Sequence, residues 1–363
     1  MKLLHIVGNR PQFVKLAVLH RRLVGLQTTN LILHTGQHFD DNMSRVFFDE
    51  LAIPRPDFNL AIKNLTHGQM IGKMLFDIDP VLHSQKPDAV IVYGDTNSTL
   101  AGALAAKKKN IPLVHIEAGV RTGDETMPEE TNRYITDRLA DLNFCCTYLG
   151  VENLKREGYF SGAISTHVYN YGDLLLDAAE LHRNLALKRA MSFEKLNSIK
   201  SFVLTTVHRT ENTENLLYLQ NIISALNKIN ERTPVVFPLH PKTRKLITAN
   251  GIKTKFLICD PLGYLDTLAL VQRSSAVITD SGGLSREGFF FSKPTLILMQ
   301  NPFWPEMFDH GNCVQANAIT EEIVSKYEST SAANKSFEVS IFGDGNAAEK
   351  ISEKIVSFLE NLA

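Results

Sequence analysis

Short apolar runs alternate with longer helix-like segments along the whole chain, and this alternation constrains the fold more than any other feature. The apolar runs typical of strands lie near residues 2–7, 30–34, 88–93, 112–116, 142–146, 202–206, 234–238, 256–258, 275–278 and 294–298. The segments typical of helices lie near residues 12–24, 40–51, 68–84, 97–108, 129–139, 148–156, 213–230, 263–271, 283–291, 319–327 and 346–361. Such alternation predicts βαβ units, and therefore an α/β protein with parallel sheets.

The length of the chain predicts two domains, because 363 residues exceed the size at which one core keeps growing. Residues 160–185 carry the connection between the halves, and the polar stretch 327–340 is expected to be a loop. We therefore expect two doubly wound domains with a cleft between them. Ligands bind such domains at the carboxyl ends of the strands.

The composition is that of a soluble globular protein. Lys+Arg is 38 and Asp+Glu is 39, so no overall charge indicates a nucleic acid or an anionic membrane as partner. No apolar stretch approaches the roughly 20 residues that span a bilayer, and the N-terminal run is too short for a signal peptide. The four cysteines show no CxxC spacing, and the adjacent Cys145 and Cys146 are expected to be buried thiols. These features favour a cytoplasmic protein.

Acidic residues follow two neighbouring strand-like runs. Asp95 ends Ala-Val-Ile-Val-Tyr-Gly-Asp, Glu117 ends Ile-Pro-Leu-Val-His-Ile-Glu, and Glu129-Glu130 follows in a Met-Pro-Glu-Glu turn. Grouped carboxylates cost desolvation and mutual repulsion, so we expect them to serve chemistry. Helix capping is the alternative for Asp95 and for Glu129-Glu130. It explains Glu117 poorly, because Ala-Gly-Val-Arg after it is typical of a loop.

Two strand-to-helix turns are candidate anion sites. Gly8-Asn9-Arg10-Pro11 follows the first strand, with Lys15 one turn into the helix, and Ser281-Gly282-Gly283 follows a strand in the second half, with Glu287 one turn on. Free N–H groups at a helix N-terminus attract phosphate, and Glu287 can accept from sugar hydroxyls. The spacings match neither GxGxxG nor a Walker A loop, so NAD and ATP are not indicated. A plain turn is the alternative at both places.

Histidines end two strands of the second half. His208 precedes Arg209 in Thr-Val-His-Arg-Thr-Glu-Asn, and His240 precedes a proline after Val-Val-Phe-Pro-Leu. An imidazole can titrate near neutral pH and a guanidinium can pair with anions. A structural role is the alternative for each histidine. No metal site is predicted, because neither HxxxH nor CxxC spacing occurs near them.

Taken in order, these motifs resemble the non-hydrolysing UDP-N-acetylglucosamine 2-epimerases. The matching stretches are GNRPQFVK, HTGQHF, GDTNSTLAGALAA, HIEAGVRTGD, MPEETNR, HRTEN, LHP, DSGG and FGDG. The resemblance implies two Rossmann-like domains in a GT-B-like fold, with the last helix crossing back to the first domain. It places the domains at residues 1–168 with 346–363, and at 169–345. It also implies a homodimer, a UDP-sugar substrate, no added cofactor and a role in polysaccharide or glycan precursor synthesis.

The resemblance further implies a reaction and a set of residues. UDP would leave C1 as C2 loses its proton, giving a 2-acetamidoglucal, and UDP would re-add after protonation on the other face. The catalytic set by motif match is Asp95, Glu117, Glu129 and His208. The set that would bind the substrate is Arg10, Lys15, Gln37, His38, Glu130, Arg133, Arg209, His240, Ser281, Gly282, Gly283 and Glu287. In some members the positions of Gln37 and His38 belong to an allosteric site for a second UDP-sugar.

Departures from the family pattern leave the sugar open. Asn9 and Gln12 replace the usual Thr and Glu, Ser285-Arg286 replaces Gln-Glu, and residues 301–306 replace a Thr-Glu-Arg-Pro-Glu loop. The main prediction is interconversion of UDP-N-acetylglucosamine and its manno epimer. The alternatives are the same reaction on a UDP-diacetamido-uronate or a 6-deoxy amino sugar, a GT-B glycosyltransferase, and a non-catalytic UDP-sugar sensor.

Overall fold

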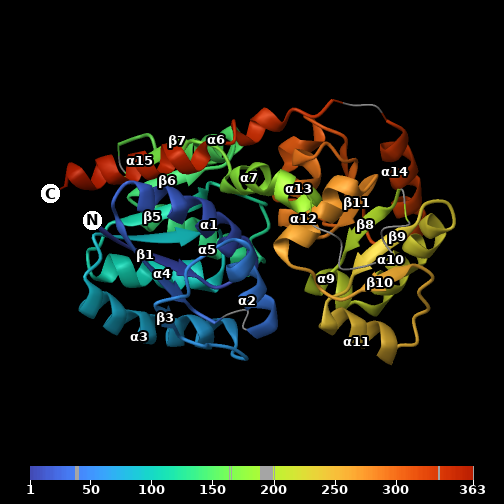
Figure 1. Ribbon diagram of the computed structural model, residues 1–363, viewed down its shortest axis with the longest axis horizontal. Coiled ribbons are helices and arrows are strands. Elements are labelled where there is room, and N and C mark those ends of the chain that lie inside the picture. The colour runs from blue at the N-terminus through green and yellow to red at the C-terminus, as the bar shows by residue number, and fades with distance from the viewer. Residues whose placement is uncertain are drawn as a thin grey trace. The chain divides into compact units, whose positions relative to one another are not determined.

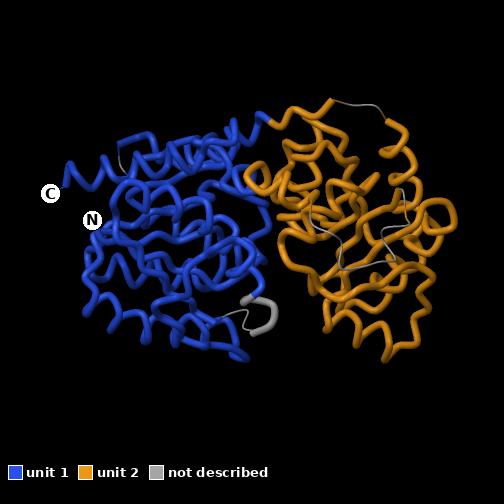
Figure 2. Tube along the Cα trace, viewed as in Figure 1, with its two compact units in different colours: residues 1–178, 340–363 blue, residues 179–339 orange. Residues whose placement is uncertain are grey.

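The computed structural model describes residues 1–36, 41–162, 164, 166–188, 199, 201–333 and 336–362, with backbone only for 41–45. The chain forms two compact units (Figure 2). Unit 1 contains Met1–Ala178 and Ser340–Ala363, and unit 2 contains Ala179–Val339. The chain thus passes between the units after Ala178 and before Ser340, whereas the sequence places these crossings after 168 and before 346. Each unit is an α/β fold with its own parallel sheet, which confirms the predicted fold class.

Unit 1 is built on a seven-stranded parallel sheet in the order β3-β2-β1-β4-β5-β6-β7. Its strands are β1 (Lys2–Val7), β2 (Thr29–His34), β3 (Phe58–Asn59), β4 (Ala89–Tyr93), β5 (Leu113–Ala118), β6 (Leu142–Cys145) and β7 (His167–Asn170). Its helices are α1 (Arg10–Gly25), α2 (Asp41–Glu50), α3 (His67–Gln85), α4 (Asn97–Lys108), α5 (Pro128–Leu139), α6 (Tyr148–Arg156) and α15 (Ala347–Glu360). The 3-10 turn Val339–Phe342, which precedes α15, spans the second boundary between the units. Helix α7 (Leu174–Lys188) contains the first boundary between the units.

Unit 2 is built on a six-stranded parallel sheet in the order β10-β9-β8-β11-β12-β13. Its strands are β8 (Val203–Thr206), β9 (Val235–Pro238), β10 (Leu257–Cys259), β11 (Ala276–Thr279), β12 (Thr295–Ile297) and β13 (Cys313–Gln315). Its helices are α9 (Thr210–Thr213), α10 (Leu216–Asn230), α11 (Pro241–Ala249), α12 (Tyr264–Arg273), α13 (Gly282–Phe290) and α14 (Thr320–Ala332), with a 3-10 turn at Pro305–Phe308.

Both sheets reverse their strand order at one point, which fixes where a site can form. In unit 1 the order reverses between β1 and β4, and in unit 2 between β8 and β11. Loops leave the carboxyl ends of these neighbouring strands in opposite directions and open a crevice. The motifs chosen from the sequence follow β1, β4, β8 and β11, with Glu117 on the adjacent strand β5.

Burial explains why the central strands are apolar without alternation. Every residue of β4 is buried, because helices cover both faces of the parallel sheet. Helices α3, α4 and α5 are neighbours in one layer of unit 1, while α1 packs against α15 (Figure 1). The core of unit 2 joins β8, β9 and β11 to α10, with Val203, Phe237 and Ile278 fully buried.

Several elements depart from the expected pattern. Strand β3 has two residues, and β7 reads His-Val-Tyr-Asn, too short and too polar for a clear apolar run. The expectation of a loop at 327–340 is wrong at both ends, because α14 continues to Ala332 and a 3-10 turn begins at Val339. Helices α7 and α11 and strand β13 were not expected. Of the helices in the described ranges, none combines the length and the apolar character that crossing a bilayer requires.

Candidate functional site

Glu117 lies at a distortion of strand β5. The pairing with β6 shifts register between Ile116 and Ala118, so Glu117 is the extra residue of a bulge. Its φ is +73°, a left-handed conformation that is costly for a residue with a Cβ. The carboxylate forms an ion pair with Lys15 of α1, whose side chain is only 2% exposed. The bulge therefore turns an acidic side chain out of the strand pattern and toward a buried cation.

Asp95 lies directly after β4 and is held by two side chains of α5. Its carboxylate forms an ion pair with Arg133, and its backbone oxygen accepts from Asn132 Nδ2 at 2.8 Å. A Cβ built on the preceding Gly94 would lie 3.7 Å from Glu117 Oε1 and 4.0 Å from Lys15 Nζ. The loop after β4 and the bulge of β5 thus bring both carboxylates, each with its own cation, into one region.

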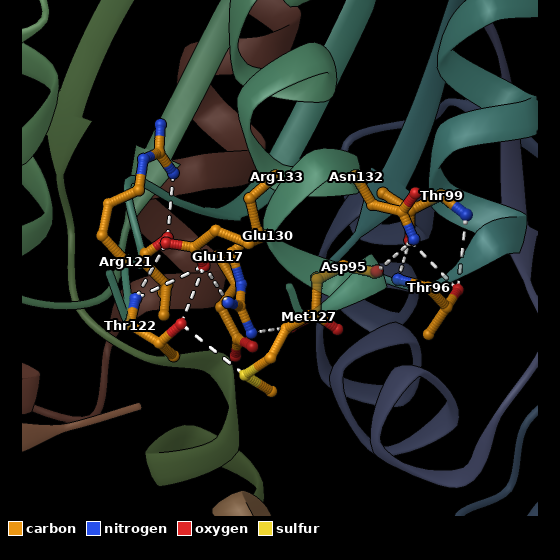
Figure 3. A network of polar contacts seen from close by, with 12 residues as sticks. Asp95, Thr96, Thr99, Glu117, Arg121, Thr122, Met127, Glu130, Asn132 and Arg133 are labelled. Carbon is orange, nitrogen blue, oxygen red and sulfur yellow. Dashed lines mark hydrogen bonds and ion pairs between the residues drawn. The ribbon is translucent and has the colours of Figure 1, made fainter. Parts of the chain in front are cut away.

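Helix α5 directs polar side chains into the protein. Its buried residues are Glu130, Asn132, Arg133, Thr136 and Asp137, while Tyr134 and Ile135 are exposed. Arg133 bridges Asp95 and Glu130, and the Glu130 carboxylate accepts from the backbone N–H groups of Thr122 and Gly123 (Figure 3). Glu130 and Arg133 therefore organise the site from within, while Glu129 is partly exposed in the first turn.

The turn after β1 is tied to the end of β4 by Gln12. Its Oε1 accepts from Gly8 N at 2.6 Å, and its Nε2 donates to the Tyr93 carbonyl oxygen at 2.6 Å. A glutamate could not make the second contact, because a carboxylate has no N–H. Asn9 caps α1 by accepting from Gln12 N, and Arg10 lies 5.2 Å from the Phe47 ring. Arg10 thus lies in the first turn of α1, and Lys15 lies in the next turn of the same helix.

In unit 2 a buried carboxylate organises the turn after β8. Asp280, fully buried, accepts from the backbone N–H groups of His208 and Arg209 at 2.9–3.1 Å. Its Oδ1 also lies 3.2 Å from Nδ1 of His208, whose side chain is 51% exposed. Asn212 donates to the same carboxylate at 3.1 Å. Asp280 orients the His208 ring and leaves half of it open.

The N-terminus of α13 is the second of the two turns that the sequence marks as candidate anion sites. Ser281 caps the helix by accepting from Leu284 N at 3.3 Å, and Gly282 and Gly283 form the first turn. A Cβ at Gly282 would lie 2.7 Å from Phe303, so only glycine fits beneath this ring. Glu287 is 7% exposed one turn further on. The dipole and the N–H groups here favour a bound phosphate.

Two arginines flank this turn and stack on the loop that departs from the family pattern. The Arg209 guanidinium lies 5.1 Å from the Phe303 ring, and that of Arg286 lies 4.3 Å from the Trp304 ring. Nε of Arg286 also donates to the Gly282 carbonyl oxygen at 3.2 Å, which folds this side chain back toward the helix N-terminus. Residues 303–304 thus fix two cations close to the glycines.

The other predicted residues have different positions. His240 caps α11, where its Nδ1 accepts from Lys242 N at 3.2 Å. Gln37 and His38 lie outside the described residues. All four cysteines are free and buried, as expected for Cys145 and Cys146.

One group among the described residues has the chemistry of metal ligands. Ligand atoms of Glu117, Cys146 and Asp173 lie within 4.8 Å of one another. Glu117 is already paired with the Lys15 ammonium, so a positive charge occupies this place without a metal.

Sequence reasoning did not single out the residues that hold these groups in place. Asp280 stands in the DSGG motif but was not singled out, and Asn132 and Asn212 were also overlooked. A signal was present in α5, where Glu130, Arg133 and Asp137 share one helical face by their spacing. A polar stripe at helical spacing looks like a solvated face until burial is known.

Together, fold and site define a class of protein. Each unit is Rossmann-like, one with paired carboxylates and cations at its switch point, the other with a phosphate-type helix N-terminus and arginines. This combination is that of an α/β enzyme acting on a nucleotide-linked substrate.

Comparison with known proteins makes the assignment specific. A sequence profile of the family described as UDP-N-acetylglucosamine 2-epimerase matches residues 25–356. The chain therefore belongs to the UDP-N-acetylglucosamine 2-epimerase family, and the resemblance inferred from its motifs is confirmed. Its relatives are UDP-sugar 2-epimerases, which are isomerases.

Three relatives illustrate the range of similarity. A UDP-2,3-diacetamido-2,3-dideoxy-D-glucuronate 2-epimerase of Pseudomonas aeruginosa is 44% identical over 97% of this chain and 99% of that protein. A UDP-N-acetylglucosamine 2-epimerase of Methanococcus maripaludis is 36% identical over 95% and 96%. The crystal structure of the Methanocaldococcus jannaschii UDP-GlcNAc 2-epimerase with UDP-GlcNAc and UDP has a TM-score of 0.91 at 35% identity, covering 99% of this chain and 100% of that one. The fold is accordingly GT-B-like.

Proposed function

We propose that this protein inverts C2 of a UDP-2-acetamido sugar, interconverting UDP-N-acetylglucosamine and UDP-N-acetylmannosamine. The observation that carries the proposal is the strained bulge that directs Glu117 toward Lys15, beside the loop of Asp95. A simple structural ion pair needs no left-handed backbone. Catalysis gives a reason to keep the strained conformation, because a base must meet the weakly acidic C–H in one fixed orientation.

The reaction requires two bonds to break and two to form. The C2–H proton goes to a base and the C1–O bond breaks with its electron pair leaving on UDP, so that a C1–C2 double bond forms. UDP then attacks C1 again as C2 receives a proton on the opposite face. Asp95 and Glu117 act around C2 in this proposal, and Glu129 and His208 serve the other face or the leaving group.

The two units have different tasks in this scheme. Unit 1 supplies Asp95, Glu117 and Glu129, while unit 2 supplies His208 and holds the UDP moiety. The α13 N-terminus with Ser281, Gly282 and Gly283 suits the pyrophosphate, and Glu287 suits the ribose hydroxyls. In unit 2, positive charge from Arg209 suits the oxygen that gains charge as UDP departs.

Deuterium exchange tests the reaction directly. Purified protein is incubated with UDP-N-acetylglucosamine in deuterated water and C2 is followed by NMR. The proposal expects deuterium at C2 and a mixture of gluco and manno forms, and Glu117→Gln should abolish both while UDP still binds. Free sugar with free UDP would instead mean hydrolysis, and unchanged exchange in Glu117→Gln would remove Glu117 from the catalytic set.

A second candidate substrate is a UDP-2,3-diacetamido uronate. The relative named for that sugar is 44% identical, against 36% and 35% for the UDP-N-acetylglucosamine 2-epimerases of Methanococcus maripaludis and Methanocaldococcus jannaschii. In addition, Arg286 and Trp304 stand where the family pattern has other residues, and they stack on each other near the α13 N-terminus. A guanidinium there suits a sugar carboxylate. Parallel exchange assays with both UDP-sugars decide between them by kcat/KM.

We also propose that the protein works as a cytoplasmic homodimer without an added cofactor. Its four buried free thiols suit a reducing compartment, and the homodimer is what the family resemblance implies. Light scattering after size-exclusion chromatography would give twice the chain mass of 40.6 kDa. Activity that survives chelator treatment would support the cofactor-free reaction.

A further inference from the structure

We propose that the buried pair His115–Asp137 is a positioning device that holds Glu117 and Asp95 in their reactive arrangement. This inference rests on the proposed function and adds two residues to it. Both side chains are fully buried, His115 on β5 and Asp137 on α5. Neither needs to touch the substrate for the proposal to hold.

The imidazole of His115 connects the two strand ends that carry the carboxylates. Its Nδ1 lies 2.7 Å from Asp137 Oδ1, and its Nε2 lies 2.7 Å from the carbonyl oxygen of Gly94. Both partners accept hydrogen bonds, so both ring nitrogens donate. Gly94 directly precedes Asp95, and His115 stands two residues before Glu117 on the same strand. One ring therefore links the backbone beside Asp95 to the strand that bears Glu117.

The carboxylate of Asp137 brackets the bulge from both sides. Its Oδ1 accepts from His115, and its Oδ2 accepts from the backbone N–H of Gly119 at 3.2 Å. These contacts fall two residues before and two residues after Glu117. Gly119 itself has φ +76°, and a Cβ there would lie 2.3 Å from the Gly150 carbonyl oxygen. The backbone path through the bulge is thus constrained at both of its ends.

Arg121 completes the charge balance of the device. Its Nη1 lies 2.8 Å from Asp137 Oδ2, and its Nε and Nη2 contact Glu157 at 2.8 Å each. Burial alone would raise the pKa of Asp137, but the hydrogen bond and charge of His115, together with Arg121, hold this pKa below its ordinary value. The carboxylate therefore stays ionised and keeps accepting from both sides of the bulge.

The physical cost of this arrangement argues for a role beyond stability. Buried ion pairs rarely stabilise a fold more than apolar residues of the same volume. Here the pair also maintains a left-handed residue at position 117, which is unfavourable in itself. Both unfavourable features, the buried ion pair and the left-handed residue, lie beside the two carboxylates of the proposed reaction. We infer that the buried pair serves to position the two carboxylates. Precise positioning matters for catalysis, because a displacement of about 1 Å can cost roughly 100-fold in rate.

The chain offers a matched control at the other end of the same strand. Asp141 Oδ2 accepts from Leu113 N at 2.8 Å where β5 begins, and the carboxylate pairs with Lys107. The experiment compares Asp137→Asn and Asp141→Asn. An asparagine at 137 can still accept on one side, but its NH₂ group cannot accept from the other. Three quantities are measured: C2 deuterium exchange, UDP affinity by calorimetry, and amide hydrogen exchange at residues 116–120.

If the pair has a positioning role, Asp137→Asn should change kcat and local amide exchange but leave substrate binding nearly unchanged. Asp137→Asn should lower kcat for C2 exchange by roughly 10- to 100-fold, change KM and UDP affinity less than about threefold, and increase amide exchange at 116–120. Asp141→Asn should leave kcat and these amides near wild type. Equal kcat in both variants, or unchanged amides at 116–120 in Asp137→Asn, would overturn the proposal. His115→Gln, which keeps one donor, should give an intermediate loss.

Failure of the proposed function would look different. If wild type showed no C2 exchange with either UDP-sugar, the assigned reaction would be wrong. The amide exchange would still decide whether the His115–Asp137 pair holds the bulge.

Discussion

At the scale of single residues, Glu117 shows how a site can oppose local backbone preference. A residue with a Cβ is held at φ +73° in a bulge, and its carboxylate meets a lysine that is 102 residues away in the chain. The conformation is unfavourable for glutamate and easy for glycine. Selection for chemistry rather than stability is the simplest reason for a glutamate at this position.

This reasoning predicts an order of stability among variants. Glu117→Gly and Glu117→Ala both remove the Lys15 partner, but only glycine relieves the left-handed strain. Glu117→Gly should therefore be more stable than Glu117→Ala by about 1 kcal/mol, and both should lack C2 exchange. Urea unfolding of the two variants gives the comparison. Equal free energies of unfolding would argue that position 117 is not strained.

His5 allows a second prediction, on pH. The ring is fully buried between Tyr93 OH (2.7 Å) and Asn30 Oδ1 (2.9 Å), and burial lowers its pKa from 6.5 to about 3. The unfolded chain therefore binds this proton more readily than the folded one. The contribution to stability is complete above pH 6.5 and declines as pH falls toward 3, by about 1.4 kcal/mol per pH unit.

The measurement is the slope of stability against pH. Between pH 6 and pH 4, wild type should lose free energy of unfolding faster than His5→Gln by about that amount per unit, as followed by circular dichroism in urea. His83→Gln, on the exposed side of α3, is the control and should keep the wild-type slope. Parallel lines for wild type and His5→Gln would contradict the prediction.

At the scale of elements, α5 and α13 show two ways of building a polar site on a helix. Helix α5 buries a charged face against β5 and the loop after β4, and it exposes Tyr134 and Ile135, the reverse of an ordinary surface helix. Helix α13 uses its end instead. There the glycines admit Phe303, and the aromatic loop fixes Arg209 and Arg286. In both helices the unusual residues are those that contact the polar groups of the candidate site.

The stacked Arg286 yields a prediction on specificity. If the substrate carries a sugar carboxylate, Arg286→Gln should lower kcat/KM for the uronate about 10- to 100-fold, the loss expected for a charge-assisted hydrogen bond of about 1.5–3 kcal/mol. Activity on UDP-N-acetylglucosamine should change far less. Arg244→Gln is a matched control in the same unit, because Arg244 is an exposed residue paired with Asp260. Equal losses on both sugars would mean that Arg286 supports the fold rather than the choice of sugar.

At the scale of the whole molecule, the chain builds two Rossmann-like units and ends in the first. Helix α15 packs on α1, and the Asp177 carboxylate of α7 accepts from Ala347 and Ala348 N–H at 3.1 and 2.7 Å. Residues from both ends of the chain thus belong to the unit that carries Asp95 and Glu117. The integrity of that unit depends on the last helix as well as on the first.

This dependence can be measured at Ile355, which is fully buried on α15. Ile355→Ala should destabilise unit 1 by about 3 kcal/mol, through lost burial and the cavity that remains. Amide exchange should rise in α1 and stay unchanged in β11 of unit 2. The exposed Glu353→Ala on the same helix is the control. Equal increases in both units would show that they unfold as one.

Patterns that are local in the chain were predictable. Strands β1, β4, β5, β8 and β11 follow from apolar runs, and the motifs after them were chosen because the carboxyl ends of parallel strands meet. Short or polar strands such as β3 and β7 could not be predicted, because a strand of two or four residues shows too little hydrophobic periodicity. Asp95 and Glu117 were singled out from the sequence, whereas Asp137, His115 and Asp280 were not assigned roles. Their roles depend on burial in the folded protein, which the amino-acid sequence does not show directly.

The sequence by itself determined the α/β class, the order of the elements, the strand ends where the polar motifs lie, and the family. Tertiary structure alone decided which cation meets which carboxylate, that Glu117 occupies a bulge, and that the charged face of α5 points inward. The physical reason is the sequence separation over which each interaction acts. Hydrophobic periodicity acts between near neighbours in the chain, whereas ion pairs and buried hydrogen bonds join residues brought together only when the sheet and its helices pack.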